Sequence, residues 1–149
     1  MFEKRMLPPT CLLIAVVLMV VLGYFLPVAH LIPRWWNLVG VVPIILGIIL
    51  DLLADRFFRQ VHATVKQGGK PAVLAVGGVY AISRNPMYLG FELILVGIAV
   101  LLGSVSPWAV VAGFGFLVQR AYICNEERVL ARKFGDLWKG YCKHTPRWI

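Results

Sequence analysis

The sequence contains little charge and few acidic residues. Charged side chains make up 15% of its 149 residues, with 7 Asp or Glu against 15 Lys or Arg. Such a basic excess in a soluble protein would suggest nucleic-acid binding, but 60% of these residues are hydrophobic and the mean hydropathy is positive. Composition therefore predicts a membrane protein without a nucleic-acid partner, and the length predicts a single domain, 1–149.

Cysteine and histidine are also scarce. The three cysteines, Cys11, Cys124 and Cys142, show no paired spacing and lie in or beside predicted membrane or cytoplasmic segments. We therefore expect reduced thiols and no disulfide framework. His62, in a polar connector, and His144, near the end of the chain, lack the spacing of metal ligands. No metal site is predicted.

Four apolar runs are separated by short polar segments. A span needs about 20 apolar residues to cross a hydrocarbon core of about 30 Å. The first run follows Lys4 and Arg5 and could be a signal peptide, but it lacks a cleavage pattern and further apolar runs follow. We expect an all-α integral membrane protein with four transmembrane helices, at about residues 10–29, 36–54, 87–102 and 108–123.

The distribution of basic residues predicts the orientation in the membrane. Residues 55–85 hold five Lys or Arg against one acidic residue, and the tail from Arg120 onward holds seven against three. The short links His30–Trp35 and Gly103–Pro107 hold one Arg between them. Because cytoplasmic segments carry the excess of Lys and Arg, we expect both basic segments and both termini to be cytoplasmic.

The two basic segments differ in character. Two Gly-Gly pairs and Lys70-Pro71 make residues 60–82 an irregular stretch, within a predicted cytoplasmic connector at 55–86. A loop of this length is commonly functional. Apolar residues recur at helical spacing in the tail, which predicts a C-terminal amphipathic helix at 124–144 that Gly135 could divide into two.

Polar groups cluster in "SRNPMYLGFE", residues 83–92, at the start of the third apolar run. Pro86 suits the first turn of a helix, whose free N–H groups could bind an anion. Alternatively, Arg84 binds lipid phosphate and Asn85 only caps the helix. Glu92 lies one to two turns further inside. A carboxylate at mid-membrane costs about 2.5–3.5 kcal/mol on insertion scales, so we expect Glu92 to face a ligand or a structural partner.

Glu126 and Glu127 stand side by side at the inner end of the fourth run. Adjacent side chains on a helix point about 100° apart, so we expect at most one of the two to turn inward. A carboxylate in this basic neighbourhood suits a ligand's ammonium or sulfonium group.

Two longer patterns contain these residues. The pattern Gly-x-Tyr-x-x-x-Arg-(His/Asn)-Pro-x-Tyr-x-Gly is matched by Gly78, Tyr80, Arg84, Asn85, Pro86, Tyr88 and Gly90. A second, a Glu-Glu pair followed by Leu, Phe-Gly, Tyr and Pro-Arg-Trp, is matched by Glu126, Glu127, Leu130, Phe134, Gly135, Tyr141, Pro146, Arg147 and Trp148. In residues 50–149 the chain thus resembles the isoprenylcysteine carboxyl methyltransferase and phospholipid methyltransferase superfamily, as a bacterial-type integral membrane member.

The resemblance implies transfer of a methyl group from S-adenosyl-methionine to a lipophilic or amphiphilic substrate, at the cytoplasmic face of an inner membrane of bacterial type. The acceptor could be an isoprenylcysteine-like carboxylate, a phospholipid amine or a small thiol. The implied catalytic residues are Arg84, Glu92 and Glu127. The implied cofactor-binding residues are Gly78, Tyr80, Arg84, Asn85, Pro86, Tyr88, Gly90, Glu126 and Glu127.

Two other functions remain open from the sequence. Membrane sterol reductases share a related C-terminal architecture and use NADPH, although this chain lacks their extra spans and a second basic cluster. A non-enzymatic lipid-binding scaffold would use the basic segments to hold anionic headgroups.

Overall fold

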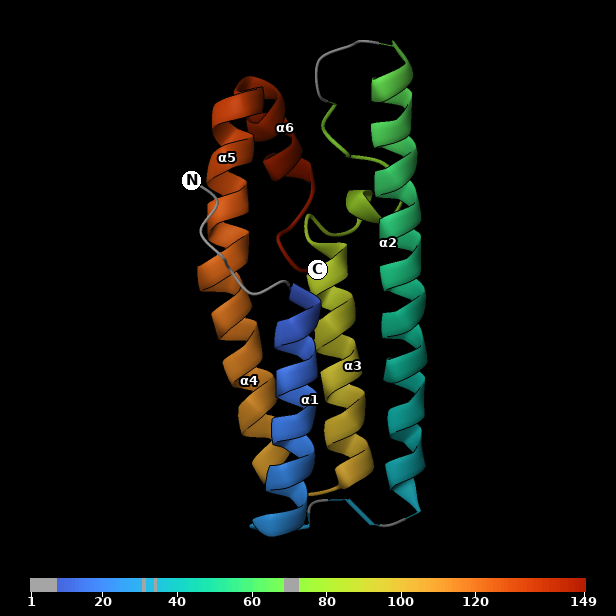
Figure 1. Cartoon of the computed structure of the whole chain (residues 1–149), viewed down its shortest axis with the longest axis vertical. Coiled ribbons are helices and arrows are strands. Elements are labelled where there is room, and N and C mark those ends of the chain that lie inside the picture. Colours follow the sequence, from blue (N-terminus) through green and yellow to red (C-terminus); the bar gives the residue numbers. More distant parts are fainter. Residues whose placement is uncertain (1–7, 31, 34, 69–72) are drawn as a thin grey trace. The chain divides into compact units, whose positions relative to one another are not determined.

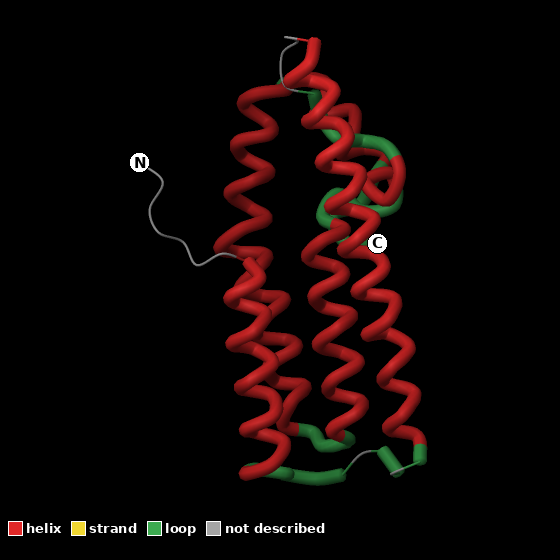
Figure 2. The backbone as a smooth tube through the Cα atoms, turned by 45° about the vertical axis from the view of Figure 1, so that its right-hand side comes forward, coloured by secondary structure: helices red, strands yellow, loops and turns green. Residues whose placement is uncertain are grey.

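A computed structural model describes residues 8–30, 32–33, 35–68 and 73–149. Within these ranges the only pairing of β type is an isolated bridge between His30 and Ser104, which confirms the all-α class. The elements, shown in Figures 1 and 2, are α1 (Pro8–Phe25), η1 (Trp36–Gly40), α2 (Val41–Gly68), η2 (Gly78–Ala81), α3 (Pro86–Leu102), α4 (Ser106–Val118), the π-helical η3 (Gln119–Ile123), α5 (Cys124–Phe134) and α6 (Asp136–His144).

Three helical stretches are long and apolar enough to cross a membrane: Pro8–Phe25, Trp36–Val61 and Ser106–Phe134. Helix α3 is also apolar but has 17 residues, which corresponds to about 26 Å at 1.5 Å per residue. The structure therefore supports an integral membrane protein with three candidate spans, and the fourth span remains a prediction.

Two predicted boundaries at the N-terminal side are wrong. Helix α1 ends at Phe25 and not at residue 29, because a residue before proline avoids the helical region and Pro27 follows. Helix α2 continues to Gly68, well beyond the predicted start of the connector at residue 55. Residues 55–67 contain no Gly or Pro to stop a helix, so a change to polar side chains does not end it. Residues 69–72 lie outside the described part.

The boundary predicted between the fourth span and the C-terminal helix also differs from the structure. Helix α4 continues through η3 into α5, so the chain is helical from Ser106 to Phe134. The break comes at Gly135, which adopts a positive φ of 52°. The alternative of two C-terminal helices, divided at this glycine, is thus confirmed.

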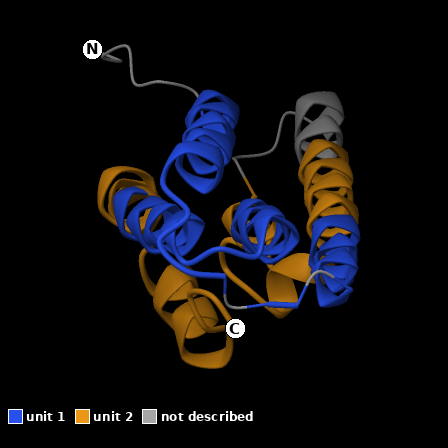
Figure 3. Ribbon diagram, turned by 90° about the horizontal axis from the view of Figure 1, so that it is seen from below, with its two compact units in different colours: residues 1–46, 91–117 blue, residues 47–90, 118–149 orange. Residues whose placement is uncertain are grey.

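The chain divides into two compact units, coloured separately in Figure 3: Met1–Leu46 with Phe91–Leu117, and Gly47–Gly90 with Val118–Ile149. We call them unit 1 and unit 2. The boundary falls inside α2 and α3, so both helices contribute to each unit. The expectation of one domain over 1–149 stays a prediction.

Unit 1 is held together by close contacts between helix backbones. A Cβ atom added to Gly97 of α3 would lie 2.5 Å from the carbonyl oxygen of Gly40 and 2.5 Å from Ile44 Cγ1. Small residues allow such approaches between membrane helices. Ser106 Oγ of α4 donates a hydrogen bond of 2.8 Å to the carbonyl of Leu26, the residue that follows α1.

Substitution of Gly97 by Ala should therefore destabilise unit 1. The added methyl group forces backbone or side chains apart, which typically costs about 1–3 kcal/mol. Gly113→Ala is a matched control, because no heavy atom of the described residues lies within 4 Å of its added Cβ. The measurement is the thermal unfolding midpoint of the detergent-purified protein. Equal midpoints for the two variants would contradict this packing.

Candidate functional site

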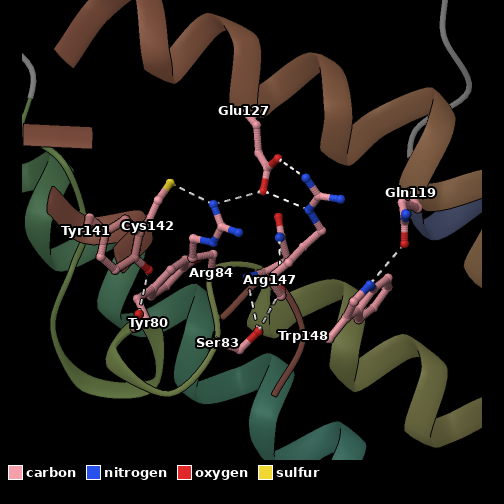
Figure 4. Close-up of polar contacts among 10 residues, drawn as sticks. Tyr80, Ser83, Arg84, Gln119, Glu127, Tyr141, Cys142, Arg147 and Trp148 are labelled. Atoms are coloured by element: carbon pink, nitrogen blue, oxygen red, sulfur yellow. Dashed lines mark hydrogen bonds and ion pairs between the residues drawn. The ribbon is translucent and has the colours of Figure 1, made fainter. Parts of the chain in front are cut away.

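Unit 2 brings the polar residues of the two sequence patterns together. They come from η2 and the loop after it, the first turn of α3, η3 with the start of α5, and the C-terminal segment Thr145–Ile149 (Figure 4). Each element contributes a few side chains, which are far apart in the sequence but close together in the fold.

Glu127 lies at the centre of this cluster. Arg147 donates two hydrogen bonds to its carboxylate, from Nε to Oε1 at 3.1 Å and from Nη2 to Oε2 at 2.7 Å. Arg84 adds an ion pair, with 3.3 Å between Nη1 and Oε1. The side chains of Glu127 and Arg84 are each 14% exposed. The Glu127 hydrogen bonds raise the pKa of Arg147, and the cluster of two arginines and one carboxylate carries a net positive charge.

Arg84 has further contacts that fix its guanidinium. Its Nη1 donates to Cys142 Sγ, and the guanidinium carbon lies 5.7 Å from the centre of the Trp138 ring. Its Nε is buried and has no hydrogen-bond partner among the described residues. An N–H group in that position can donate to an anionic ligand group, because an unpaired buried donor is costly.

Glu126 faces a different neighbour from Glu127. The hydroxyl of Tyr88, a buried residue in the first turn of α3, donates to Glu126 Oε1 at 2.9 Å. The rings of Tyr88 and Tyr122 lie 6.2 Å apart. Both glutamates therefore contact other elements of unit 2, but Glu126 as a whole is exposed and Glu127 is the more buried of the two. This agrees with the expectation that at most one of them turns inward.

The C-terminal segment is fastened to the loop before α3. Its backbone carbonyl at Arg147 accepts hydrogen bonds from Asn85 Nδ2 at 3.1 Å and from Ser83 Oγ at 3.3 Å. The backbone N–H of Arg84 donates to Pro146 O at 3.0 Å. Asn85, predicted to line a cofactor pocket, thus uses its amide to hold the chain end. A role toward a cofactor stays a prediction.

Tyr80 lies in η2 between two helices. Its ring is 5.9 Å from that of Phe57 in α2, and its backbone carbonyl accepts a hydrogen bond from the Tyr141 hydroxyl of α6. Burial, helped by the negative charges of Glu126 and Asp55, raises the pKa of Tyr80 to about 12. Gly78 precedes it with a φ of 57°, and its added Cβ would lie 3.1 Å from Phe57.

The remaining predicted residues of α3 fall into two groups. Pro86 is fully buried as the first residue of the helix. Gly90 faces α2, where its added Cβ would lie 2.1 Å from Asp51 Oδ1, so only glycine fits. Glu92 belongs to unit 1. A Cβ added to Gly115 of α4 would lie 3.2 Å from its Oε1, and its Oε2 is buried without a hydrogen-bond partner among the described residues.

The sequence alone does not assign Arg147, Cys142 and Trp138 to the site. Trp138 falls within the predicted C-terminal amphipathic helix, and Cys142 is expected only to be a reduced thiol. The available signal is the Pro146-Arg147-Trp148 ending, which matches the second pattern but carries no predicted role. Among the described residues, no group of three or more His, Cys, Asp or Glu is placed to hold a metal ion.

The family model described as phospholipid methyltransferase matches residues 35–137, well over half of the chain. The chain belongs to the phospholipid methyltransferase family. This finding confirms the resemblance inferred from the two sequence patterns, and the match includes every residue predicted to form the site.

Curated relatives agree with the family. A protein-S-isoprenylcysteine O-methyltransferase of Schizosaccharomyces pombe is 34% identical over 91 residues, which are 59% of this chain and 37% of the relative. The enzyme of the same name from Dictyostelium discoideum is 30% identical over 130 residues, 80% of this chain and 51% of the relative. The chain therefore spans about a third to a half of the length of these relatives. No solved structure matches it significantly.

The raised pKa of Tyr80 predicts a loss of stability at alkaline pH. An unfolded tyrosine ionises near pH 10, whereas folded Tyr80 keeps its proton to about 12. Between these values the folded state binds more protons, so this contribution is complete below pH 10 and is lost as the pH rises to 12. The free energy of unfolding, measured with urea across that pH range, should fall less steeply in Tyr80→Phe than in the wild type. Tyr24→Phe, at an 81% exposed position, should keep the wild-type slope.

Proposed function

We propose that the protein is an S-adenosyl-methionine-dependent methyltransferase that acts on a lipophilic or amphiphilic substrate at the cytoplasmic membrane face. One observation carries the proposal. Unit 2 places a net positive cluster of Arg84, Arg147 and Glu127 beside a second carboxylate, that of Glu126, which is the neighbour of Glu127 on α5. Membership of a methyltransferase family and the O-methyltransferase names of two relatives support it.

The charges of the site fit the zwitterionic end of such a cofactor. The cofactor's carboxylate could accept a hydrogen bond from the unpaired Nε–H of Arg84. Its ammonium group could bind a carboxylate of the glutamate pair. Tyr88 and Tyr122 add aromatic surface beside Glu126, where a cation is also favourable. Opposite charges on the protein and on the ligand would thus be paired.

Methyl transfer of this kind requires little acid–base catalysis from the protein. The bound cofactor supplies a methyl group already activated by its sulfonium. The residues of unit 2 would hold the donor in one orientation and exclude water, which is the main catalytic contribution in a transfer of this kind. Gly78 and Gly90 would contribute shape through the backbone, since a Cβ added to them would lie 3.1 Å from Phe57 and 2.1 Å from Asp51, respectively. Pro86, which is fully buried, would contribute as the first residue of α3.

Glu92 is proposed to act on the substrate side. Its carboxylate oxygen without a hydrogen-bond partner among the described residues lies in an apolar helix, where polar groups usually serve a ligand. We also propose that α3 is a fourth span and that both termini are cytoplasmic, in an inner membrane of bacterial type. The basic residues of 55–85 and of the tail support that orientation.

Ligand binding tests the function directly. Calorimetric titration of the detergent-purified protein with S-adenosyl-homocysteine should show saturable binding, whereas NADPH should show none. Arg84→Gln should weaken binding about tenfold or more, because a charge-assisted hydrogen bond is lost. Arg128→Gln, at an exposed position on α5, is the matched control and should bind like the wild type. Binding of NADPH alone would favour a reductase, and binding of neither ligand a scaffold.

Transfer of a labelled methyl group separates substrate residues from cofactor residues. With an S-isoprenylated cysteine as the first acceptor, Glu92→Gln should lower the transfer rate and leave S-adenosyl-homocysteine affinity unchanged. Equal losses in both measurements would place Glu92 at the cofactor. Gln has nearly the same size as Glu, so the change removes charge with little effect on packing.

The topology is tested with reporters at the C-terminus. A fused fluorescent protein that matures only in the cytoplasm should fluoresce in a bacterial host, and a fused periplasmic phosphatase should stay inactive. The reverse pattern would contradict the charge-based orientation and would place the tail, with Arg147, on the outer side.

A further inference from the structure

We propose that the two adjacent glutamates have different tasks: Glu126 binds the ligand's cationic group, whereas Glu127 forms an internal clamp in which Arg147 is a positioning residue. This inference rests on the proposed function and assigns roles within the same site. The sequence, by contrast, left open which glutamate faces the cofactor and assigned no role to Arg147.

The contacts of Glu127 leave it little capacity for a ligand. Both of its carboxylate oxygens accept hydrogen bonds from Arg147, and Oε1 also pairs with Arg84. Two guanidinium groups therefore neutralise one carboxylate that is 14% exposed. An approaching ammonium group would have to displace an arginine from a bidentate pair, which is among the stronger polar contacts in proteins.

Glu126 is in the opposite situation. Its Oε1 accepts a single hydrogen bond from a neutral hydroxyl, that of Tyr88, and the residue is exposed. No ion pair joins it to any residue in the described ranges. Because the charge of this carboxylate is uncompensated, it is the better acceptor for a ligand's ammonium or sulfonium group.

Arg147 reaches Glu127 because the chain end is held in place. Ser83 and Asn85 both donate to the backbone carbonyl of Arg147, and Trp148 Nε1 donates to Gln119 Oε1 at 3.2 Å. These bonds place the guanidinium in line with the carboxylate of Glu127 (Figure 4). The last residues of the chain thus act on the site through Glu127, without needing a contact with the ligand.

The clamp also determines which hydrogen-bond donors of Arg84 are available to a ligand. With Glu127 already engaged by Arg147, Arg84 contributes one terminal nitrogen to the pair, and its buried Nε–H stays unpaired within the described part of the chain. Without Arg147, Glu127 could draw the whole guanidinium of Arg84 toward itself. Arg147 would therefore keep Arg84 oriented toward an anionic ligand group.

A double-mutant cycle tests these roles. The variants are Glu126→Gln, Glu127→Gln, Arg147→Gln and the double variant Glu127→Gln with Arg147→Gln, each titrated with S-adenosyl-homocysteine and unfolded thermally in detergent. Glu126→Gln should weaken binding about tenfold or more with an unchanged unfolding midpoint. Glu127→Gln and Arg147→Gln should each weaken binding severalfold, and the double variant should lose no more than the larger single loss.

Control variants separate positioning from general damage. Arg147→Lys keeps the charge but makes a single contact, so it should recover part of the lost affinity. Arg132→Gln, at an exposed position on α5, should match the wild type. Additive losses in the double variant, or a loss in Glu127→Gln as large as in Glu126→Gln at an unchanged midpoint, would overturn the division of roles.

The same variants distinguish this inference from the proposed function. If the wild type fails to bind S-adenosyl-homocysteine, the proposed function and the assignment of Glu126 both fail. The unfolding midpoints still measure the pairing of Glu127 with Arg147, since coupled side chains give a double variant less destabilised than the sum of the single variants. Additive shifts of the unfolding midpoint would contradict the pairing of Glu127 with Arg147 as well.

Discussion

The ion pair between Glu127 and two arginines is the interaction on which unit 2 depends. Leaving one charge of a half-buried pair without its partner is strongly unfavourable, so the three side chains constrain one another. Through Arg84 the pair fixes the loop before α3, through Glu127 it fixes α5, and through Arg147 it fixes the chain end. Hydrogen bonds from Ser83 and Asn85 to the backbone carbonyl of Arg147 hold the C-terminal segment in that arrangement.

Helix continuity determines where Glu127 lies. The helix that begins at Ser106 does not stop where its apolar part ends, and it continues through the π-helical turn Gln119–Ile123 into α5. A π turn inserts an extra residue and changes the direction of the side chains that follow it, and such turns often occur at functional sites. Here only Cys124 and Asn125 separate it from the glutamate pair, and it provides Gln119 as the acceptor for Trp148.

Local signals in the sequence predicted the all-α class, the bounds of α3 and the break at Gly135, because apolar runs and glycine act within a few residues. Two patterns predicted some residues of the candidate site, but they assigned no role to Arg147, Cys142 or Trp138. What the sequence could not provide was the partner of each side chain. Arg84 and Arg147 are 63 positions apart, and their meeting at Glu127 depends on tertiary packing. Nor could composition show that α2 continues to Gly68, since polar residues do not end a helix.

Most of the charged residues of the chain belong to unit 2. The part of α3 that belongs to unit 1 carries one charged residue, Glu92. Hydrocarbon disfavours unpaired charge, so a protein of this kind gathers its ionisable groups where water and partners are available. Glu92 is the exception in α3, with an oxygen that no described residue satisfies. An exception of that kind persists at a cost in stability, which is the physical argument for the proposal that Glu92 serves a ligand.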